Sequence, residues 1–326
     1  MRIEKRGNKY RIQPMINGKR QSITLDHKPT QQEILALIDE LKESVNSSTT
    51  FEKACSSMIN DKSNVLSPST IRGYKNILNG LSPQFKMLTL HNITNVEVQK
   101  EINKQSTRLS AKSVSNYYGL ISAVMSYYMP NKRIKVKLPT KAKEKPYCPS
   151  ADDIRALLED ARDNGFGEKY ILPIMLGCYG MRLGEVAALT DEDIDVENRL
   201  ITINKSVVVD EYNNLVIKPT AKTKKSNRVI QVVETVIQAY LLYGLYEGYP
   251  KTITNYMARR EAVLGLNHFS FHKLRHYFAS SSIDAGLPLS TIQDFGGWST
   301  PRTLQNIYQH NMRDYDEISE KIGAVF

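Results

Sequence analysis

The chain of 326 residues lacks several features that would place it in well-defined protein classes. Its three cysteines, Cys55, Cys148 and Cys178, lie far apart in the sequence. This spacing argues against a disulfide framework and against a zinc ribbon, and it fits a reducing compartment. No apolar run approaches the roughly 20 residues of a membrane helix, and the basic N-terminus has no signal-peptide core. We therefore expect a cytoplasmic protein without a membrane partner.

Nucleotide and calcium motifs are also missing. The sequence has no Gly-rich phosphate loop followed by Lys and then Ser or Thr. Three aspartates alternate between Asp191 and Asp195, but the next residue is Val196 where a calcium loop requires Gly. The aspartates therefore predict a turn and not a metal site.

A zinc site is the remaining metal hypothesis. His272 and His276 have the i, i+4 spacing of a helical metal pair. However, Lys273 and Arg275 lie between them, and the Glu that a zincin needs is absent. Neighbouring cations oppose binding of a divalent ion, so we predict no metal and no cofactor.

Positive charge is the most pronounced feature that is present. The formal net charge is +10 and the pI is about 9.3, which favours a polyanionic partner, most often nucleic acid. Seven Lys or Arg residues lie within residues 1–25, and seven more lie within residues 131–145. A basic run is usually a solvated face or a linker, but two such blocks flanking folded segments favour DNA.

The N-terminal region predicts a small sheet followed by a helix. Residues 10–16 and 19–25 alternate polar and apolar side chains on either side of Asn17-Gly18, which is a β-hairpin pattern. Thr30 and Glu33 form a capping box that opens a helix. Its inner face is expected to carry Ile34, Leu35, Leu37, Ile38 and Leu41.

An all-helical domain is expected over residues 49–130. After a short polar linker at residues 47–50, helices are predicted to follow Ser67-Pro68, Thr94 and Ser110. Packing between helices is the favoured interpretation of Tyr117, Tyr118, Tyr127 and Tyr128. Residues 131–148 have no periodicity, which predicts an extended basic linker.

The last part of the chain predicts an α+β domain over residues 149–326. Ser150 is the expected cap of a helix that runs to Ala161, and residues 170–179 form a strongly apolar helix. Residues 200–209, 215–217 and 228–233 are rich in β-branched side chains, which predicts one three-stranded antiparallel sheet. The whole chain is therefore expected to be mainly α-helical with small antiparallel β-sheets.

The clearest chemical pattern lies between residues 271 and 310. His272 and Arg275 stand at i and i+3 on a predicted helix whose N-cap is Ser270, so they project from one face. An imidazole and a guanidinium side by side can hold one anion, and phosphate is the usual one. Trp298 follows two glycines, and Tyr308 lies on a further short helix opened by residues 300–301.

Two upstream boxes accompany this pattern. Residues 182–185 read Arg-Leu-Gly-Glu, and residues 222–228 read Lys-Thr-Lys-Lys-Ser-Asn-Arg, which predicts a hairpin that leads into a strand. Taken in chain order, Arg182, Lys222, His272 with Arg275, Trp298 and Tyr308 resemble the catalytic series of the tyrosine recombinases, or phage-type integrases. The resemblance covers about residues 150–310 well. It departs from the common pattern at Trp298, where most members have His, and at Lys273, where they have Asp.

The resemblance implies a role for each residue. Arg182 and Arg275 would hold the non-bridging oxygens of a scissile phosphodiester, which a Lys cannot do in bidentate geometry. Lys222 would protonate the leaving 5′ oxygen, His272 would accept or steer the proton of Tyr308, and Trp298 would donate a hydrogen bond to the phosphate. Lys218, Lys224 and Lys225 are near enough in sequence to compete with Lys222 for its role. Tyr308 would attack the phosphorus and form a 3′-phosphotyrosyl bond, so that rejoining needs no ATP.

The resemblance also implies DNA-binding domains and partners. Residues 1–46 would be an arm-type DNA-binding domain, residues 49–130 a core-binding domain, residues 131–148 a basic linker, and residues 149–326 the catalytic domain. Double-stranded DNA and a homotetramer on DNA are the expected partners. The apolar residues of the C-terminal tail, Ile318, Ile322 and Val325, would pack on a neighbouring subunit. A host DNA-bending protein or an excision factor is a further partner class. The expected DNA-binding residues are Lys5, Arg6, Lys9, Arg11, Lys19, Arg20, Arg72, Lys75, Lys112, Asn116 and Lys135.

Two other functions stay open at this stage. A type IB topoisomerase would use the same chemistry to cut and reseal one duplex, although the small size and the basic hairpin favour integration. A DNA-binding regulator without catalysis would not need Tyr308. Covalent trapping on DNA separates the two enzymes from the regulator.

Overall fold

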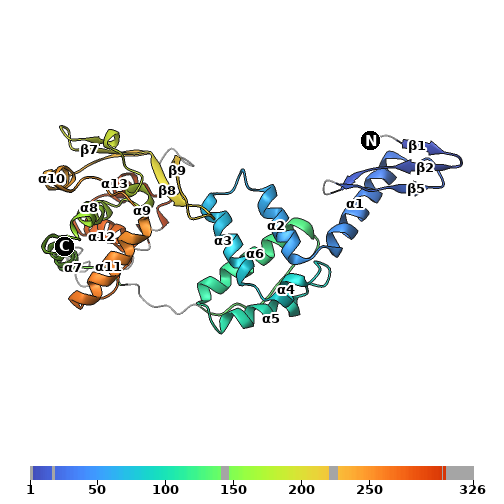
Figure 1. Cartoon of the computed structure of the whole chain (residues 1–326), viewed down its shortest axis with the longest axis horizontal. Helices are drawn as coiled ribbons and strands as arrows, with labels where there is room; N and C mark the ends of the chain where they lie inside the picture. The colour runs from blue at the N-terminus through green and yellow to red at the C-terminus, as the bar shows by residue number, and fades with distance from the viewer. Residues whose placement is uncertain (1–2, 17–18, 141–146, 220–226, 303, 306–326) are drawn as a thin grey trace, which may run out of the picture. The chain divides into compact units, whose positions relative to one another are not determined.

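The computed structural model describes residues 3–16, 19–140, 147–219, 227–302 and 304–305 (Figure 1). The chain divides into two compact units, Met1–Lys143 and Glu144–Phe326. The expected fold class, mainly α-helical with small antiparallel sheets, is confirmed. A further division of the first unit into domains of residues 1–46 and 49–130 stays a prediction. None of the described helices is both long and apolar enough to span a bilayer.

The first unit begins with five short strands and one long helix. These are β1 Ile3–Arg6, β2 Lys9–Ile12, β3 Met15–Ile16, β4 Lys19–Arg20, β5 Ile23–Leu25 and α1 Gln31–Ser48. β3 pairs with β4 and β2 pairs with β5, both antiparallel, as the expected hairpin requires. The turn residues Asn17 and Gly18 lie outside the described residues. β1 adds a strand, paired with β2, that the sequence pattern did not predict.

The capping box of α1 is confirmed, but its apolar face is narrower than expected. The backbone N–H of Thr30 donates to Glu33 Oε2 at 2.8 Å, and the backbone N–H of Glu33 donates to Thr30 Oγ1 at 3.3 Å. The hydrogen bond that the backbone N–H of Thr30 donates to the Glu33 carboxylate is the main cause that lowers the pKa of Glu33. Leu35, expected on the inner face, is 58% exposed.

The helices of the first unit surround a core of buried side chains. They are α2 Phe51–Asp61, α3 Pro68–Gly80, α4 Pro83–Met87, α5 Asn95–Ser106 and α6 Ala111–Tyr128. The caps at Ser67, Thr94 and Ser110 are confirmed as helix starts. Tyr117 belongs to the core, as expected for a packing residue, whereas Tyr127 is 46% exposed.

Helix α2 was not predicted, and the expected linker at residues 47–50 is wrong. α1 continues to Ser48, and Thr50 is both the N-cap of α2 and the bridge partner of Thr89. Phe51 and Met58 of α2 are buried in the core. The serine and threonine run therefore joins two helices directly.

Residues 141–146 of the expected linker at residues 131–148 lie outside the described residues, and its first part is fastened to the helices. Residues 131–140 form neither helix nor strand. Ile134 is buried in the core, and its carbonyl accepts a hydrogen bond from the hydroxyl of Tyr118 at 2.8 Å. The backbone N–H of Lys137 donates to Gln99 Oε1 at 2.7 Å, and Gln99 Nε2 donates back to the carbonyl of Lys137 at 3.0 Å. This segment is a strap on α5 and α6.

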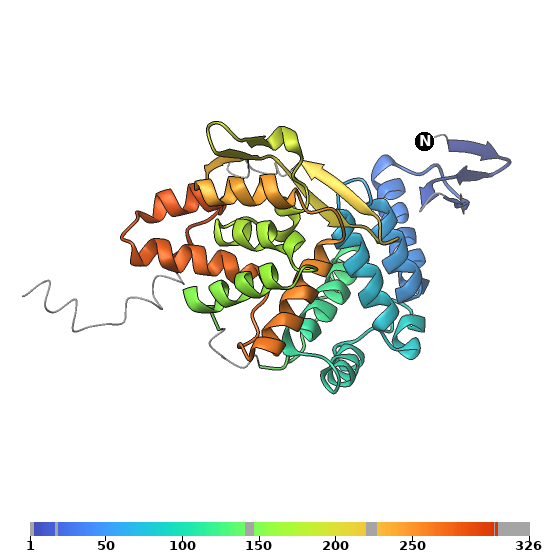
Figure 2. The same ribbon diagram turned by 60° about the vertical axis from the view of Figure 1, so that its left-hand side comes forward.

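The second unit places its strands on one side of a group of helices (Figure 2). Its helices are α7 Ala151–Asp163, α8 Ile171–Cys178, α9 Leu183–Val186, α10 Glu234–Tyr243, α11 Pro250–Leu264, α12 Phe271–Asp284 and α13 Leu289–Gly296. Its strands are β6 Ile194–Asp195, β7 Leu200–Ile203, β8 Lys205–Val209, β9 Leu215–Pro219 and β10 Arg228–Gln231. Ser150 caps α7 through a capping box with Asp153, as expected.

The single three-stranded sheet expected for this unit is wrong in its composition. The run from Leu200 to Val209 is interrupted at Asn204 and contributes to two sheets. β7 lies between β6 and β10, while β8 and β9 form a separate two-stranded hairpin. The aspartates, expected to form a turn, lie instead in a 3-10 helix at residues 191–193 and at the end of β6, where Asp195 accepts a hydrogen bond from the backbone N–H of Asn198.

Candidate active site

Helix α12 presents His272 and Arg275 from one face because its other face is anchored in the core. Phe271 and Leu274 are buried there. Gly177 of α8 allows the two helices to approach closely, since a Cβ at that position would lie 2.8 Å from a methyl carbon of Leu274. α12 begins after Ser270 as predicted, although the Ser270 side chain makes no cap hydrogen bond.

Arg275 is a buried cation held by backbone carbonyls. Its side chain is among the largest fully buried ones, and Nη1 donates to the carbonyls of Gly180 and Gly296. Its guanidinium carbon lies 3.7 Å from the ring centroid of Trp298. Burial, followed by the nearby charge of Arg182, lowers the pKa of Arg275 to about 9, so it is still protonated at neutral pH.

Two nitrogen atoms of Arg275 remain available. Nε and Nη2 are buried and have no hydrogen-bond partner among the described residues. Unpaired buried donors carry a free-energy cost that an acceptor removes, so these two nitrogens can donate to an acceptor brought to this point.

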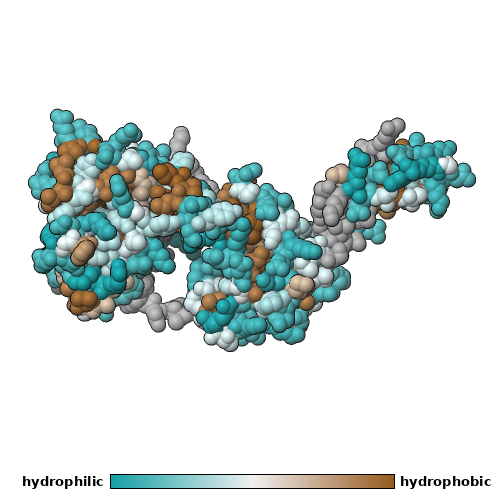
Figure 3. Space-filling view, in the orientation of Figure 1, coloured by the Kyte–Doolittle hydropathy of each residue, from teal (hydrophilic) through white to brown (hydrophobic). Residues whose placement is uncertain are grey.

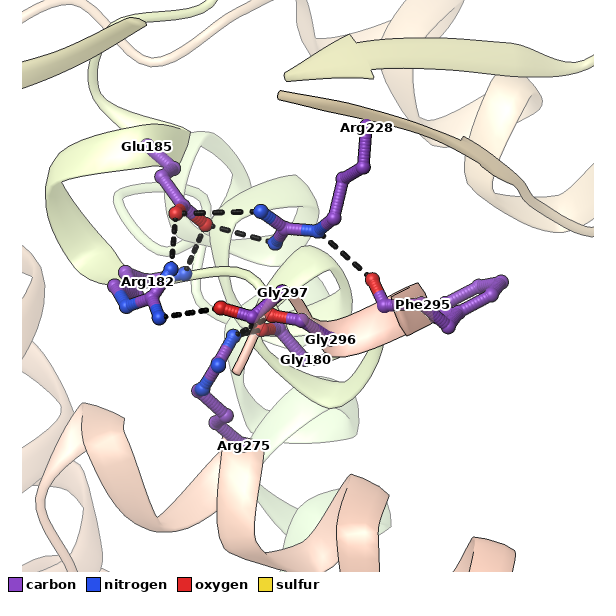
Figure 4. Close-up of polar contacts among 8 residues, drawn as sticks. All are labelled: Gly180, Arg182, Glu185, Arg228, Arg275, Phe295, Gly296 and Gly297. Carbon is purple, nitrogen blue, oxygen red and sulfur yellow. Dashed lines mark hydrogen bonds and ion pairs between the residues drawn. The ribbon is translucent and has the colours of Figure 1, made fainter. Parts of the chain in front are cut away.

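Arg182 meets the same turn from the other side. It precedes α9, and its side chain is 41% exposed. Nη1 contacts Glu185 Oε1 at 2.6 Å, and Nη2 donates to the carbonyl of Gly297 at 2.8 Å (Figure 4). Arg182 and Arg275 therefore bind the carbonyls of two consecutive residues, which brings the two arginines of the predicted series together.

Glu185 and Arg228, which have no role in the predicted catalytic series, complete this cluster. Glu185 is 2% exposed, and Arg228 contacts both of its carboxylate oxygens, at 2.9 and 3.3 Å. Burial alone would raise the pKa of Glu185, but hydrogen bonds and charge from Arg228, and then from Arg182, lower it overall. Glu185 is the last residue of the Arg-Leu-Gly-Glu motif, and Arg228 is the last residue of the motif at residues 222–228. Their positions in these two motifs are the sequence signal that could have identified them.

Trp298 lies beneath Arg275 and is only 8% exposed. Its ring also stacks on Phe278, with centroids 6.2 Å apart. A tryptophan face attracts a cation, so the indole stabilises the charge of the buried arginine. Its predicted hydrogen bond to a phosphate stays a prediction.

His272 belongs to the same electrostatic environment. Burial, followed by the charges of Arg275, Arg182 and Lys273, lowers its pKa, which favours the neutral ring. A neutral imidazole can accept a proton near neutral pH, as the predicted role of His272 requires. His276 contacts it edge to face, with ring centroids 5.1 Å apart. Burial, then the charge of Lys273, lowers the pKa of His276 to about 4.

Two predicted catalytic residues cannot be placed. Lys222 and Tyr308 lie outside the described residues, as do the competing lysines Lys224 and Lys225. Lys218, the remaining competitor, lies on β9 opposite Ser206. The structure therefore brings together Arg182, His272, Arg275 and Trp298.

Three of the expected DNA-binding residues of the N-terminal sheet, Arg6, Lys9 and Arg11, share one face. The register pairs Arg6 with Lys9 and Glu4 with Arg11, so these four side chains lie on the same side of the sheet. The visible face of this sheet is mainly hydrophilic in Figure 3. Lys5 lies on the opposite face with Tyr10 but is also exposed. Arg20 is exposed, and the side chain of Lys19 lies outside the described part.

The remaining expected DNA-binding residues differ in exposure. Lys112 and Asn116 are exposed on α6, and Lys135 is exposed on the strap. Arg72 and Lys75 of α3 are partly buried, and each has an interaction partner, so the outward orientation expected for them is only partly met.

Comparisons with known proteins match two family models to parts of this chain. The model described as the phage integrase family matches residues 150–314, and one described as a phage integrase N-terminal SAM-like domain matches residues 50–106. The chain is 25% identical over 177 residues to the transposase of transposon Tn916 from Enterococcus faecalis, covering 45% of this chain and 44% of that protein. It therefore spans less than half the length of that relative. It is 24% identical over 269 residues to tyrosine recombinase XerC from Alcanivorax borkumensis, covering 75% and 84% of the two chains.

Solved structures share the fold. The Tn1549 transposon integrase in complex with transposon right end DNA matches with a TM-score of 0.69 at 17% identity, covering 85% of this chain and 100% of that one. A lambda integrase tetramer bound to a Holliday junction matches with a TM-score of 0.59 at 17% identity, covering 96% and 99%. Since the first family model spans half of the sequence and contains the whole arginine cluster, the chain belongs to the phage integrase family.

Proposed function

We propose that the chain is a site-specific DNA recombinase that cuts and rejoins DNA through a 3′-phosphotyrosyl intermediate. It would integrate or excise a phage or another mobile element. The observation that carries this proposal is the convergence of Arg182 and Arg275 on the turn at residues 296–297, with His272 close enough for both charges to lower its pKa. The named relatives, a transposase and a recombinase, support the same chemistry.

The cluster has the charge that phosphodiester cleavage needs. Arg182 and Arg228 share one buried carboxylate, that of Glu185, and Arg275 adds a third guanidinium nearby, so the cluster has a net positive charge. In the transition state, negative charge grows on the non-bridging phosphate oxygens, and preorganised cations stabilise it. The free Nε and Nη2 of Arg275 and the half-exposed side chain of Arg182 are the groups that would bind these oxygens.

The attack would come from the phenol oxygen of Tyr308. This oxygen bonds to phosphorus, the bond from phosphorus to the 5′ oxygen breaks, and Lys222 gives the leaving oxygen its proton. Neutral His272 accepts or steers the phenol proton, because an ordinary tyrosine pKa near 10 leaves the group protonated at neutral pH. The reverse reaction, with a 5′ hydroxyl of a partner strand, rejoins DNA.

Strand exchange would also need an assembly on DNA. An apolar cavity of about 570 Å³ lies on the second unit, and its lining includes Val233, Leu287, Ile292 and Phe295. The C-terminal tail has apolar residues at roughly helical spacing, Ile318, Ile322 and Val325. We infer that the tail of one subunit packs into the cavity of its neighbour in a homotetramer. Deletion after residue 314, or the change Leu287→Asp at the rim, should then spare DNA binding and abolish strand exchange; unchanged exchange contradicts the inference.

The proposed chemistry is tested with a nicked suicide substrate that carries the recombination site. The wild-type chain should form a covalent adduct with the 3′ phosphate, and Tyr308→Phe should bind the DNA without forming it. Absence of an adduct on DNA that the protein binds would favour a catalytically inactive regulator. An adduct without exchange between two duplexes would favour a topoisomerase of type IB.

A further inference from the structure

Arg228 is an extensively bonded arginine of the second unit for which the proposed mechanism has no use. It is the first residue of β10, and its side chain is 6% exposed. Nη2 donates to Glu185 Oε2 at 2.9 Å, Nη1 donates to Glu185 Oε1 at 3.3 Å, and Nε donates to the carbonyl of Phe295 at 2.8 Å. All three contacts are visible in Figure 4. One planar guanidinium thus connects β10 to Glu185 and to Phe295. A Lys has a single nitrogen donor and cannot make all three contacts.

Each partner of Arg228 leads directly to a residue that would hold the phosphate. Glu185 receives both the backbone N–H of Arg182, at 2.9 Å, and its guanidinium. Phe295 lies just before Gly296 and Gly297, whose carbonyls bind Arg275 and Arg182. A displacement of Arg228 would therefore act on both phosphate-binding arginines at once.

The turn itself is shaped around Arg228. Gly297 has a φ of +68°, and a Cβ at that position would lie 2.8 Å from Nη1 of Arg228. The turn is therefore left-handed and in close contact with the guanidinium, so only glycine fits without a shift. Trp298, which supports Arg275, is the next residue in the chain.

Charge gives Arg228 a second effect. The carboxylate of Glu185 is nearly buried and is shared by Arg182 and Arg228. Without Arg228, Arg182 would be the only cation paired with this buried carboxylate, and the pair would tighten. The guanidinium of Arg182 would then be less available to a phosphate.

We propose that Arg228 is a positioning residue for DNA cleavage, which holds Arg182, Arg275 and Trp298 in place through Glu185 and the carbonyl of Phe295. The proposal rests on the proposed function, because it concerns the same phosphate site. Arg228 does not itself bind the phosphate. Misplacement of catalytic groups by about 1 Å can cost about 10²-fold in rate, which sets the expected size of the effect.

The test compares Arg228→Gln with Arg260→Gln. Arg260 makes a similar two-nitrogen contact with a carboxylate, Asp160, in the same unit, but this pair joins α11 to α7. Single-turnover cleavage of the nicked substrate, DNA affinity and Tm are measured for both variants. Arg228→Gln should lower the cleavage rate about 10²-fold and change DNA affinity less than about threefold. Arg260→Gln should lower Tm and leave the cleavage rate within about threefold of wild type.

A conservative variant keeps the test decisive if Arg228→Gln does not fold. Arg228→Lys retains the charge beside Glu185 but cannot also reach the carbonyl of Phe295. It should fold and cleave at a rate between those of wild type and the Gln variant. A cleavage rate equal to wild type in Arg228→Lys, or equal rate losses in Arg228→Gln and Arg260→Gln, overturns the proposal.

A sulfur leaving group identifies what Arg228 positions. In a 5′-phosphorothiolate substrate the bond from phosphorus to sulfur breaks and a thiolate leaves without needing a proton. This substrate should restore cleavage in Lys222→Ala but not in Arg228→Gln, since the latter disturbs phosphate binding. Recovery of Arg228→Gln to the wild-type rate would instead place its effect on proton donation and overturn the proposal. Failure of the wild-type chain to cleave either substrate would count against the proposed function itself.

Discussion

Two basic regions of this chain hold their positive charge in opposite ways. In the N-terminal sheet, Arg6 and Lys9 are exposed, and each lies 3.5 Å from the carboxylate of a surface acid, Glu4 and Asp26 respectively. In the second unit, Arg275 is 1% exposed and donates to two backbone carbonyls. An exposed charge keeps its hydration and can follow a mobile polyanion, whereas a buried charge has one fixed position. The contrast suits DNA attraction in the first region and phosphate chemistry in the second.

The two regions should therefore respond differently to the same kind of substitution. Loss of charge from the sheet should weaken DNA binding and its salt dependence without changing the chemical step. Loss of one guanidinium from the cluster should stop the chemistry while most of the DNA affinity remains. The following changes test this contrast.

The largest expected effect comes from Arg275→Lys. The shorter, single-nitrogen donor cannot hold both carbonyls and also bind a phosphate oxygen. Removal of one preorganised donor to a developing oxyanion typically costs about 10²–10³-fold in rate, so single-turnover cleavage should fall by that factor. DNA affinity, measured by mobility shift, should change only a few fold. Arg260→Lys is the matched control, and equal losses in both variants would contradict the contrast.

A smaller effect is expected when Arg6, Lys9 and Arg11 are all replaced by Gln. Each phosphate contact contributes about 0.9 to the slope of log affinity against log salt. The slope for DNA with the full recombination site should therefore fall by up to about 2.7 in magnitude. Cleavage of a short duplex that contains only the core site should keep the wild-type rate. An unchanged salt slope would mean that this face of the sheet does not contact DNA.

Gly297→Ala should combine strain with a local collision. Gly265 has nearly the same backbone conformation, φ +69° against +68°, but a Cβ there meets no atom within 4 Å. Both alanine variants should lose about 1 kcal/mol of unfolding free energy from the left-handed conformation. Only Gly297→Ala should also slow cleavage, because its Cβ displaces Arg228. Equal cleavage rates in the two variants would show that the contact with Arg228 is not needed.

The smallest effect concerns stability at acidic pH. The folded chain lowers the pKa of His276 to about 4 and that of His272 in the same direction. The unfolded chain, with histidine pKa values near 6.5, binds more protons between about pH 6.5 and pH 4, so stability is lost as pH falls through that window. His276→Asn should flatten the fall of Tm between these pH values. His91→Asn, at an exposed position of the first unit, should not, and an identical Tm profile for both variants would argue against this linkage.

The sequence predicted elements well where one local rule was sufficient. The caps at Ser67, Ser110 and Ser150 marked helix starts because their hydroxyls accept hydrogen bonds or their extended backbone precedes a proline. The i, i+3 spacing placed His272 and Arg275 on one face of α12. These are properties of a few consecutive residues.

Other elements were missed although their patterns were present. Phe51, Cys55 and Met58 have the spacing of an amphipathic helix, and Ile134, Val136 and Leu138 alternate with basic residues along the strap. The flanking polar and basic residues favoured a linker interpretation in both places. The partition of residues 200–209 between two sheets was not predictable, because both halves are equally rich in β-branched side chains and pairing depends on distant strands.

The role of Arg228 was beyond local patterns for a similar reason. Its partner Glu185 lies 43 positions away and the carbonyl of Phe295 lies 67 positions away. A backbone carbonyl has no sequence signature, so no motif predicts which arginine will reach it. Only the folded chain brings these groups together.

The most direct test of the account is to locate the covalent bond between protein and DNA. A nicked suicide substrate is cleaved by the wild-type chain, the adduct is digested with protease and nuclease, and the modified peptide is sequenced by mass spectrometry. The account predicts a nucleotide joined through its 3′ phosphate to Tyr308. A phosphate joined to another residue, a bond to a 5′ end, or cleavage without any covalent intermediate would contradict it.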